Sequence, residues 1–119
     1  MFRSRILLVE DDAPLRETLT EILGEEGYEV ASAANGAEAL ALLEAADAPS
    51  LILLDLMMPV MNGWELHLAL RADPRLAEIP VVVLSARAGV SGGALPDAAA
   101  FLAKPFDAAR LLDTVGRLV

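Results

Sequence analysis

Five residues whose side chains can do chemistry stand directly after short apolar runs. They are Glu10, Asp11, Asp55, Ser85 and Lys104. None of these residue types is one that packing in an apolar core would select. If the apolar runs are parallel strands, their carboxyl ends meet at one edge of a sheet. We therefore expect the five side chains to form one site.

The charges of these side chains indicate what the site could bind. Three carboxylates and one ammonium group leave a net charge of about −2, which is unfavourable unless a cation binds among them. Oxygen ligands without His or Cys suit Mg²⁺ better than zinc or copper. With a lysine and a hydroxyl nearby, such an ion favours phosphoryl transfer, which needs positive charge around the phosphoryl oxygens. In that chemistry Asp55 is the nucleophile and becomes an aspartyl phosphate.

Five apolar runs are predicted to be the strands that position these residues. They cover residues 4–9, 28–33, 51–54, 81–84 and 99–103. Nearly continuous apolar strands between amphipathic helices are typical of a parallel sheet that is covered on both faces. With right-handed crossovers, this pattern predicts one doubly wound α/β domain over residues 1–119.

Two helices are predicted in the N-terminal half. The first has its N-cap at Asp12 and Pro14 in its first turn, and Gly27 ends it. Its apolar face comprises Leu15, Leu19, Ile22 and Leu23. The second begins with a capping box formed by Asn35 and Glu38 and extends to about residue 46. Its inner face is expected to include Ala37, Leu40 and Leu43.

The helices of the C-terminal half are less regular. Residues 64–71 form one helix, in which Trp64 is expected to serve packing rather than a cofactor. His67 is expected to lie on the surface or in the core rather than to act as a phosphodonor. Residues 86–97 are rich in Gly and Pro, so a fourth helix there is expected to be short or distorted. Asp107 caps the last helix. Its apolar face comprises Ala108, Leu111, Leu112, Val115 and Leu118.

Composition excludes several classes of function. The net charge of −9 repels phosphate backbones and disfavours direct nucleic-acid binding. The absence of cysteine excludes disulfides, thiolate metal sites and cysteine nucleophiles. The apolar runs are too short for a membrane span or a signal peptide, so we expect a cytoplasmic protein without membrane insertion.

Four motifs of the chain resemble, in the same order, those of the receiver domain of two-component response regulators. They are LLVEDD at 7–12, LLDLMMP at 53–59 with NG at 62–63, LSA at 84–86, and AKPF at 103–106. The resemblance covers essentially the whole chain. It implies a flavodoxin-like fold with strand order 2-1-3-4-5. We expect either a stand-alone, single-domain receiver or a receiver that is part of a larger protein.

The resemblance also implies how the acids are used. Asp55 is the phosphoacceptor and, with Asp11 and the backbone carbonyl of Met57, ligates Mg²⁺. Glu10 acts on the ion mainly through water. Met57 and Arg87 flank the site and are expected to tune hydrolysis of the acyl phosphate.

The remaining site residues are expected to bind the phosphoryl group or to respond to it. Ser85 would form a hydrogen bond with the group, and Lys104 would pair with it. The Lys104–Pro105 peptide bond is expected to be cis. Ser85 and Phe101 form the switch, in which an aromatic ring without a hydroxyl follows the movement of the serine.

By the same resemblance, the chain is a phosphoacceptor that assists its own phosphorylation and dephosphorylation rather than an enzyme. Its expected partners are a histidine kinase or histidine phosphotransfer protein and a downstream protein target, and the unphosphorylated chain is expected to be a monomer. One alternative is an interaction module of the same fold that is not phosphorylated. Another is an aspartyl-phosphate hydrolase of the haloacid dehalogenase type, but such enzymes have a second Asp where this chain has Met57. A nucleotide-binding role is disfavoured because the chain contains neither G-x-G-x-x-G nor a P-loop.

Overall fold

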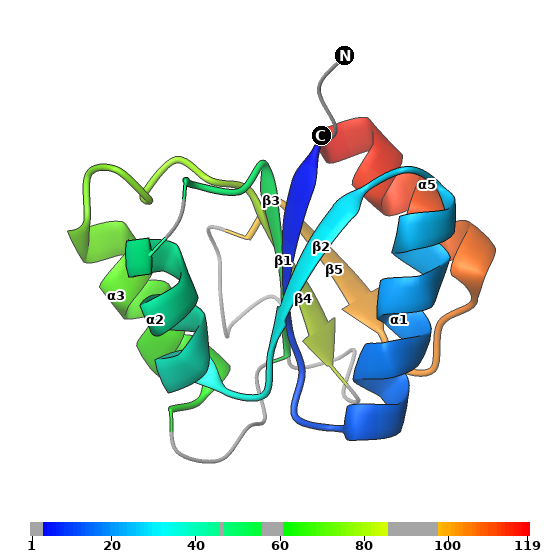
Figure 1. Ribbon diagram of the computed structural model, residues 1–119, viewed down its shortest axis with the longest axis horizontal. Coiled ribbons are helices and arrows are strands. Elements are labelled where there is room, and N and C mark those ends of the chain that lie inside the picture. The colour runs from blue at the N-terminus through cyan, green and yellow to red at the C-terminus, as the bar shows by residue number, and fades with distance from the viewer. Residues whose placement is uncertain (1–3, 46, 56–60, 86–97) are drawn as a thin grey trace.

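Five strands form one parallel sheet at the centre of the molecule (Figure 1). The computed structural model describes residues 4–45, 47–55, 61–85 and 98–119. The strands are β1 Arg5–Val9, β2 Glu29–Ala33, β3 Leu51–Asp55, β4 Val81–Ser85 and β5 Ala100–Ala103. Their order is β2-β1-β3-β4-β5, which confirms the doubly wound α/β fold. Each strand begins and ends within one residue of its predicted bounds.

Four helices among the described residues cover the two faces of this sheet, as Figure 1 shows. They are α1 Ala13–Glu25, α2 Gly36–Ala45, α3 Gly63–Ala72 and α5 Ala108–Leu118. α2 and α3 cover one face, and α1 and α5 cover the other. No helix in the described part of the chain is both long enough and apolar enough to span a bilayer.

Alternate strand residues pack into two separate cores, because successive side chains of a strand point to opposite faces. In β3, Ile52 and Leu54 pack against α2 and α3. Their neighbours Leu51 and Leu53 pack against α1 and α5. All four side chains have no exposed surface, which explains why the strand is apolar throughout.

The predicted N-caps of α1 and α5 are confirmed, and a glycine follows α1 as expected. The Asp12 side chain accepts a hydrogen bond of 3.4 Å from the Leu15 N–H at the start of α1. Asp107 accepts one of 2.8 Å from the Arg110 N–H at the start of α5. After α1, Gly27 has a φ of 93°, a left-handed conformation that glycine adopts without steric cost.

The inner face predicted for α2 is wrong in one position. The buried residues are Gly36, Ala39 and Leu43, whereas Ala37 is exposed. Positions 36, 39 and 43 follow the three- and four-residue spacing of one helical stripe, and position 37 lies off it. Half of the predicted capping box is confirmed, because Asn35 Oδ1 accepts from the Glu38 N–H at 2.9 Å, but the Glu38 carboxylate accepts from the Ala34 N–H rather than from the Asn35 N–H.

The predicted face of α5 needs a similar correction. Leu111 and Val115 are buried, with Leu112 and Leu118 half-buried against them, but Ala108 is exposed. Thr114 is buried instead and completes the stripe. The short or distorted fourth helix predicted at 86–97 lies outside the described residues.

Candidate functional site

Three carboxylates converge at the carboxyl ends of β1 and β3. Val9 of β1 pairs with Leu54 of β3, so the residues that follow them, Glu10 and Asp55, are neighbours. One ligand oxygen from each of Glu10, Asp11 and Asp55 lies within 4.8 Å of the other two. Glu10 has no exposed surface and Asp55 has 4%, whereas Asp11 is exposed. The cluster therefore combines two buried acids with one that faces solvent.

The carboxylate of Glu10 is held by two hydrogen bonds. Its Oε1 accepts from the Lys104 ammonium at 2.7 Å, and its Oε2 accepts from the Asp12 N–H at 3.2 Å. The Glu10 N–H in turn donates to the Ala33 carbonyl at 3.0 Å. A buried carboxylate is costly unless such partners satisfy it. This direct bond between Glu10 and Lys104 was not among the sequence-based expectations.

Lys104 lies between the two buried acids. Besides its contact with Glu10, its Nζ is 3.6 Å from Oδ2 of Asp55. Burial lowers the pKa of Lys104, but the hydrogen bond to Glu10 and the charges of Asp55 and Glu10 outweigh it and raise that pKa above 10.5. The side chain is thus a fixed cation at neutral pH. Its peptide bond to Pro105 is cis, as the resemblance implies.

The donor set fits a hard divalent cation. Three carboxylates face one ammonium group, so a net charge of about −2 remains at the cluster. All three candidate ligands offer carboxylate oxygen, the donor that Mg²⁺ prefers. The exposed position of Asp11 leaves the cluster accessible to an ion from solution.

The other predicted site residues are only partly described. Ser85 ends β4, where its backbone pairs with Ala103, the residue before Lys104. Phe101 of β5 is half-buried and packs against the core beneath α2 and α3. Met57 and Arg87 lie outside the described residues, so their assigned roles stay predictions.

The aromatic residues of α3 serve packing, as expected. Trp64 is half-buried against the core beneath α2 and α3, where Met61 also packs. His67 is 6% exposed, so of the two places expected for it, core and surface, it takes the core.

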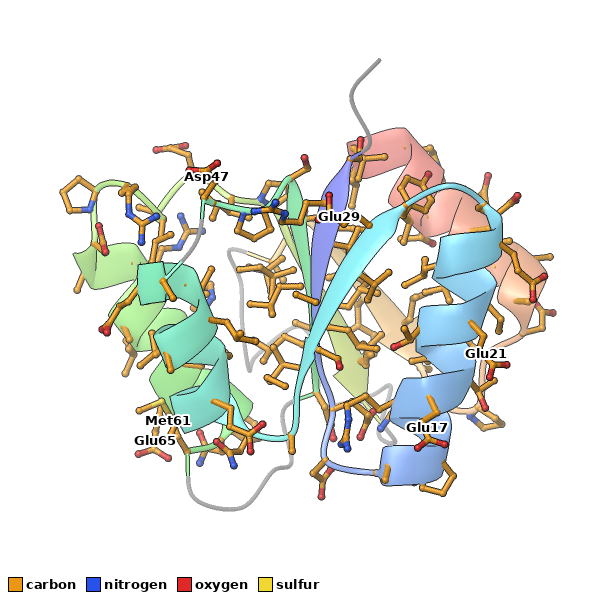
Figure 2. All side chains as sticks on the ribbon, viewed as in Figure 1. Glu17, Glu21, Glu29, Asp47, Met61 and Glu65 are labelled. Carbon is orange, nitrogen blue, oxygen red and sulfur yellow. The ribbon has the colours of Figure 1, made fainter. Side chains whose placement is uncertain are left out.

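Two contacts around the start of α3 were not predicted from the sequence. Asn62 Oδ1 accepts from the Glu65 N–H at 2.9 Å, and Glu65 Oε1 accepts from the Asn62 N–H at 3.1 Å, which is a complete capping box. The spacing of Asn and Glu was a readable signal for it. The Gly36 N–H also donates to the Met61 carbonyl at 3.0 Å. Figure 2 shows Met61 and Glu65 at the same end of the molecule as the carboxyl ends of the strands.

Comparison with known proteins agrees with this geometry. Residues 6–116 match the response regulator receiver domain family. A curated relative, the DNA-binding response regulator MtrA of Mycobacterium tuberculosis H37Rv, is 45% identical over 85 residues. That match covers 71% of this chain but 36% of MtrA, so the chain spans about a third of the length of this relative.

Solved structures resemble the fold over almost its whole length. The chemotaxis response regulator CheY4 of Vibrio cholerae is 32% identical with a TM-score of 0.89, and the match covers 99% of this chain and 100% of CheY4. The response regulator TrrA of Thermotoga maritima, solved in complex with Mg²⁺ and BeF, is 32% identical with a TM-score of 0.87. That match covers 98% of this chain and 99% of TrrA. The chain belongs to the response regulator receiver domain family.

Proposed function

We propose that this receiver domain is a signalling switch in which Asp55 accepts a phosphoryl group in a Mg²⁺-dependent step. The observation that carries the proposal is the convergence of Glu10, Asp11 and Asp55 beside the Lys104 ammonium. The structure of TrrA, which contains Mg²⁺ and BeF, supports the choice of ion. The donor would be the phosphohistidine of a histidine kinase or of a histidine phosphotransfer protein.

In the transfer step, a carboxylate oxygen of Asp55 forms a bond to phosphorus. The bond between phosphorus and the imidazole nitrogen of the donor breaks, and the nitrogen keeps its electron pair. Bound Mg²⁺ supplies positive charge to the phosphoryl oxygens. Asp11, Asp55 and the Met57 carbonyl would hold the ion, and Glu10 would act mainly through water.

Lys104 would supply the second positive charge. Its Nζ is 3.6 Å from Asp55 Oδ2, close enough to reach an oxygen of a group attached there. Its 2.7 Å bond to Glu10 keeps the ammonium next to the nucleophile before the phosphoryl group arrives. The same position would favour pairing with the product, because the new group carries additional negative charge.

The response to phosphorylation would pass through β4 and β5. Ser85 at the end of β4 would form a hydrogen bond with the phosphoryl group, and Phe101 would follow it. Because Phe101 packs against the core beneath α2 and α3, its movement would shift the balance between two surface states. Met57 and Arg87 would tune the hydrolysis that ends the signal.

The partners that follow from this proposal are proteins of the cytoplasm. A donor protein and a downstream protein target would bind residues 1–119, which would form one domain. This domain would be a monomer until it is phosphorylated. The absence of direct nucleic-acid binding stays a prediction for this chain. MtrA, a relative of greater length, is described as DNA-binding.

Intact-mass spectrometry during incubation with acetyl phosphate tests the proposal. The wild type should gain one phosphoryl group when Mg²⁺ is present and none with a chelator, and Asp55→Asn should gain none. Asp47→Asn is the matched control, because Asp47 is exposed and lies at the opposite end of the molecule (Figure 2). A wild type that stays unmodified at all early times would contradict the proposal and favour the interaction module without phosphorylation.

A further inference from the structure

Arg16 of α1 reaches back to the turn between β1 and α1. Its Nη1 donates a hydrogen bond of 2.8 Å to the carbonyl oxygen of Glu10. The side chain is half-buried, and its own backbone N–H donates to the Asp12 carbonyl at 2.8 Å. The guanidinium group thus ties the first turns of α1 to the segment that carries the acids.

The carbonyl that Arg16 holds belongs to the peptide group between Glu10 and Asp11. The Glu10 carboxylate and N–H are already fixed by other partners, but Asp11 is exposed, so packing does not fix the direction of its carboxylate. The preceding peptide group, whose carbonyl Arg16 holds, sets where the Cα of Asp11 lies and so limits the positions that its carboxylate can reach. We infer that Arg16 is a positioning residue, which keeps the Asp11 carboxylate aimed at the metal site. This inference rests on the proposed Mg²⁺-dependent function.

The direction of the change in Mg²⁺ affinity distinguishes a positioning role of Arg16 from a purely electrostatic one. Arg16 is a cation near a cation site, so removing its charge alone would strengthen Mg²⁺ binding. Removing its hydrogen bond would release the peptide group and weaken Mg²⁺ binding. A net hydrogen bond corresponds to a change of roughly two- to tenfold in an equilibrium constant. We expect the loss of the bond to outweigh the loss of the charge in Arg16→Met, so that the Kd for Mg²⁺ rises by at most about that factor.

The chain offers a closely matched control. Arg71 also donates through Nη1 to a backbone carbonyl six residues away, that of Ala77, and the distance is again 2.8 Å. Arg71 lies in the last turn of α3, whereas the acidic cluster lies at the end where α3 begins. Arg71→Met thus removes the same charge and the same kind of bond away from the metal site.

The test is a MgCl₂ titration of the full chain followed by ¹H–¹⁵N NMR, with a thermal unfolding curve for each variant. Arg16→Met should show the raised Kd, and Arg71→Met should keep the wild-type Kd even if both variants unfold at a lower temperature. An unchanged or lowered Kd in Arg16→Met, or an equal rise in Arg71→Met, would overturn the inference. A wild type without any Mg²⁺-dependent shift would overturn the proposed function and this inference with it.

Discussion

Gly36 begins α2 where that helix touches the residue that precedes the N-cap of α3. A Cβ at position 36 would lie 2.7 Å from Met61 Cγ, 2.8 Å from the Met61 carbonyl oxygen and 2.9 Å from its Cβ. The carbonyl cannot move aside freely, because it accepts the 3.0 Å hydrogen bond from the Gly36 N–H. We predict that Gly36→Ala pushes the start of α2 away from Met61 and destabilises the protein.

Two opposing effects determine the size of this loss. Alanine favours a helix over glycine by up to about 1 kcal/mol, but less at the first helical residue. Forcing an extra methyl group into a packed site costs about 1–3 kcal/mol. The expected net loss in the free energy of unfolding is therefore about 1–2 kcal/mol. For a domain of this size that corresponds to a Tm lower by roughly 4–8 °C.

Urea unfolding followed by circular dichroism, with calorimetry for Tm, measures the effect. Gly24 in α1 and Gly116 in α5 are the controls, because a Cβ at either would meet no described atom within 4 Å. Alanine at either position should raise stability by about 0.5–1 kcal/mol. A steric clash at position 36 is refuted if Gly36→Ala is as stable as the wild type, or if all three variants shift in one direction.

Two further predictions concern the charged cluster. The pKa of Lys104 is raised in the folded state, so the stability that its charge contributes is complete below pH 10.5 and is lost as the pH rises through the folded pKa. The difference in the free energy of unfolding between wild type and Lys104→Met, from urea titrations, should therefore shrink above pH 10.5, and a constant difference would count against this. Mg²⁺ at ten times its Kd should stabilise the wild type by about 1.4 kcal/mol, whereas Asp11→Asn should gain much less. Thermal melts at matched ionic strength measure this, and equal gains in both proteins would exclude a role for Asp11.

The positions of the site residues could be predicted because they depend on the hydrophobic pattern alone. Four of the expected residues, Glu10, Asp11, Asp55 and Lys104, follow or end apolar strands, and the rule for parallel sheets brings such positions together. Their contacts depend on side-chain conformations, which no pattern encodes. The sequence therefore could not show that Lys104 lies closer to Glu10 than to Asp55.

The buried faces of the helices show a different limit of prediction from sequence. α2 contains apolar residues on almost every side, so periodicity could not choose between Ala37 and Ala39 for the core. The apolar pattern of α5 does not predict that Thr114 is buried, because a residue with a hydroxyl group is not counted as apolar. Arg16 was missed because a bond from a side chain to a backbone carbonyl leaves no periodic trace in the sequence.

Among the described residues, no buried side chain belongs to both of the cores that lie on either side of the sheet. Leu53 and Leu54 are adjacent in the chain, yet each belongs to a different core. Substitutions that lie far apart on opposite faces should therefore add in their effects on the free energy of unfolding, whereas substitutions in contact on one face should interact. During evolution, the surface formed by α1 and α5 and the surface formed by α2 and α3 can therefore diverge independently. The acids at the strand ends would keep their places while the helices around them acquire new binding specificities.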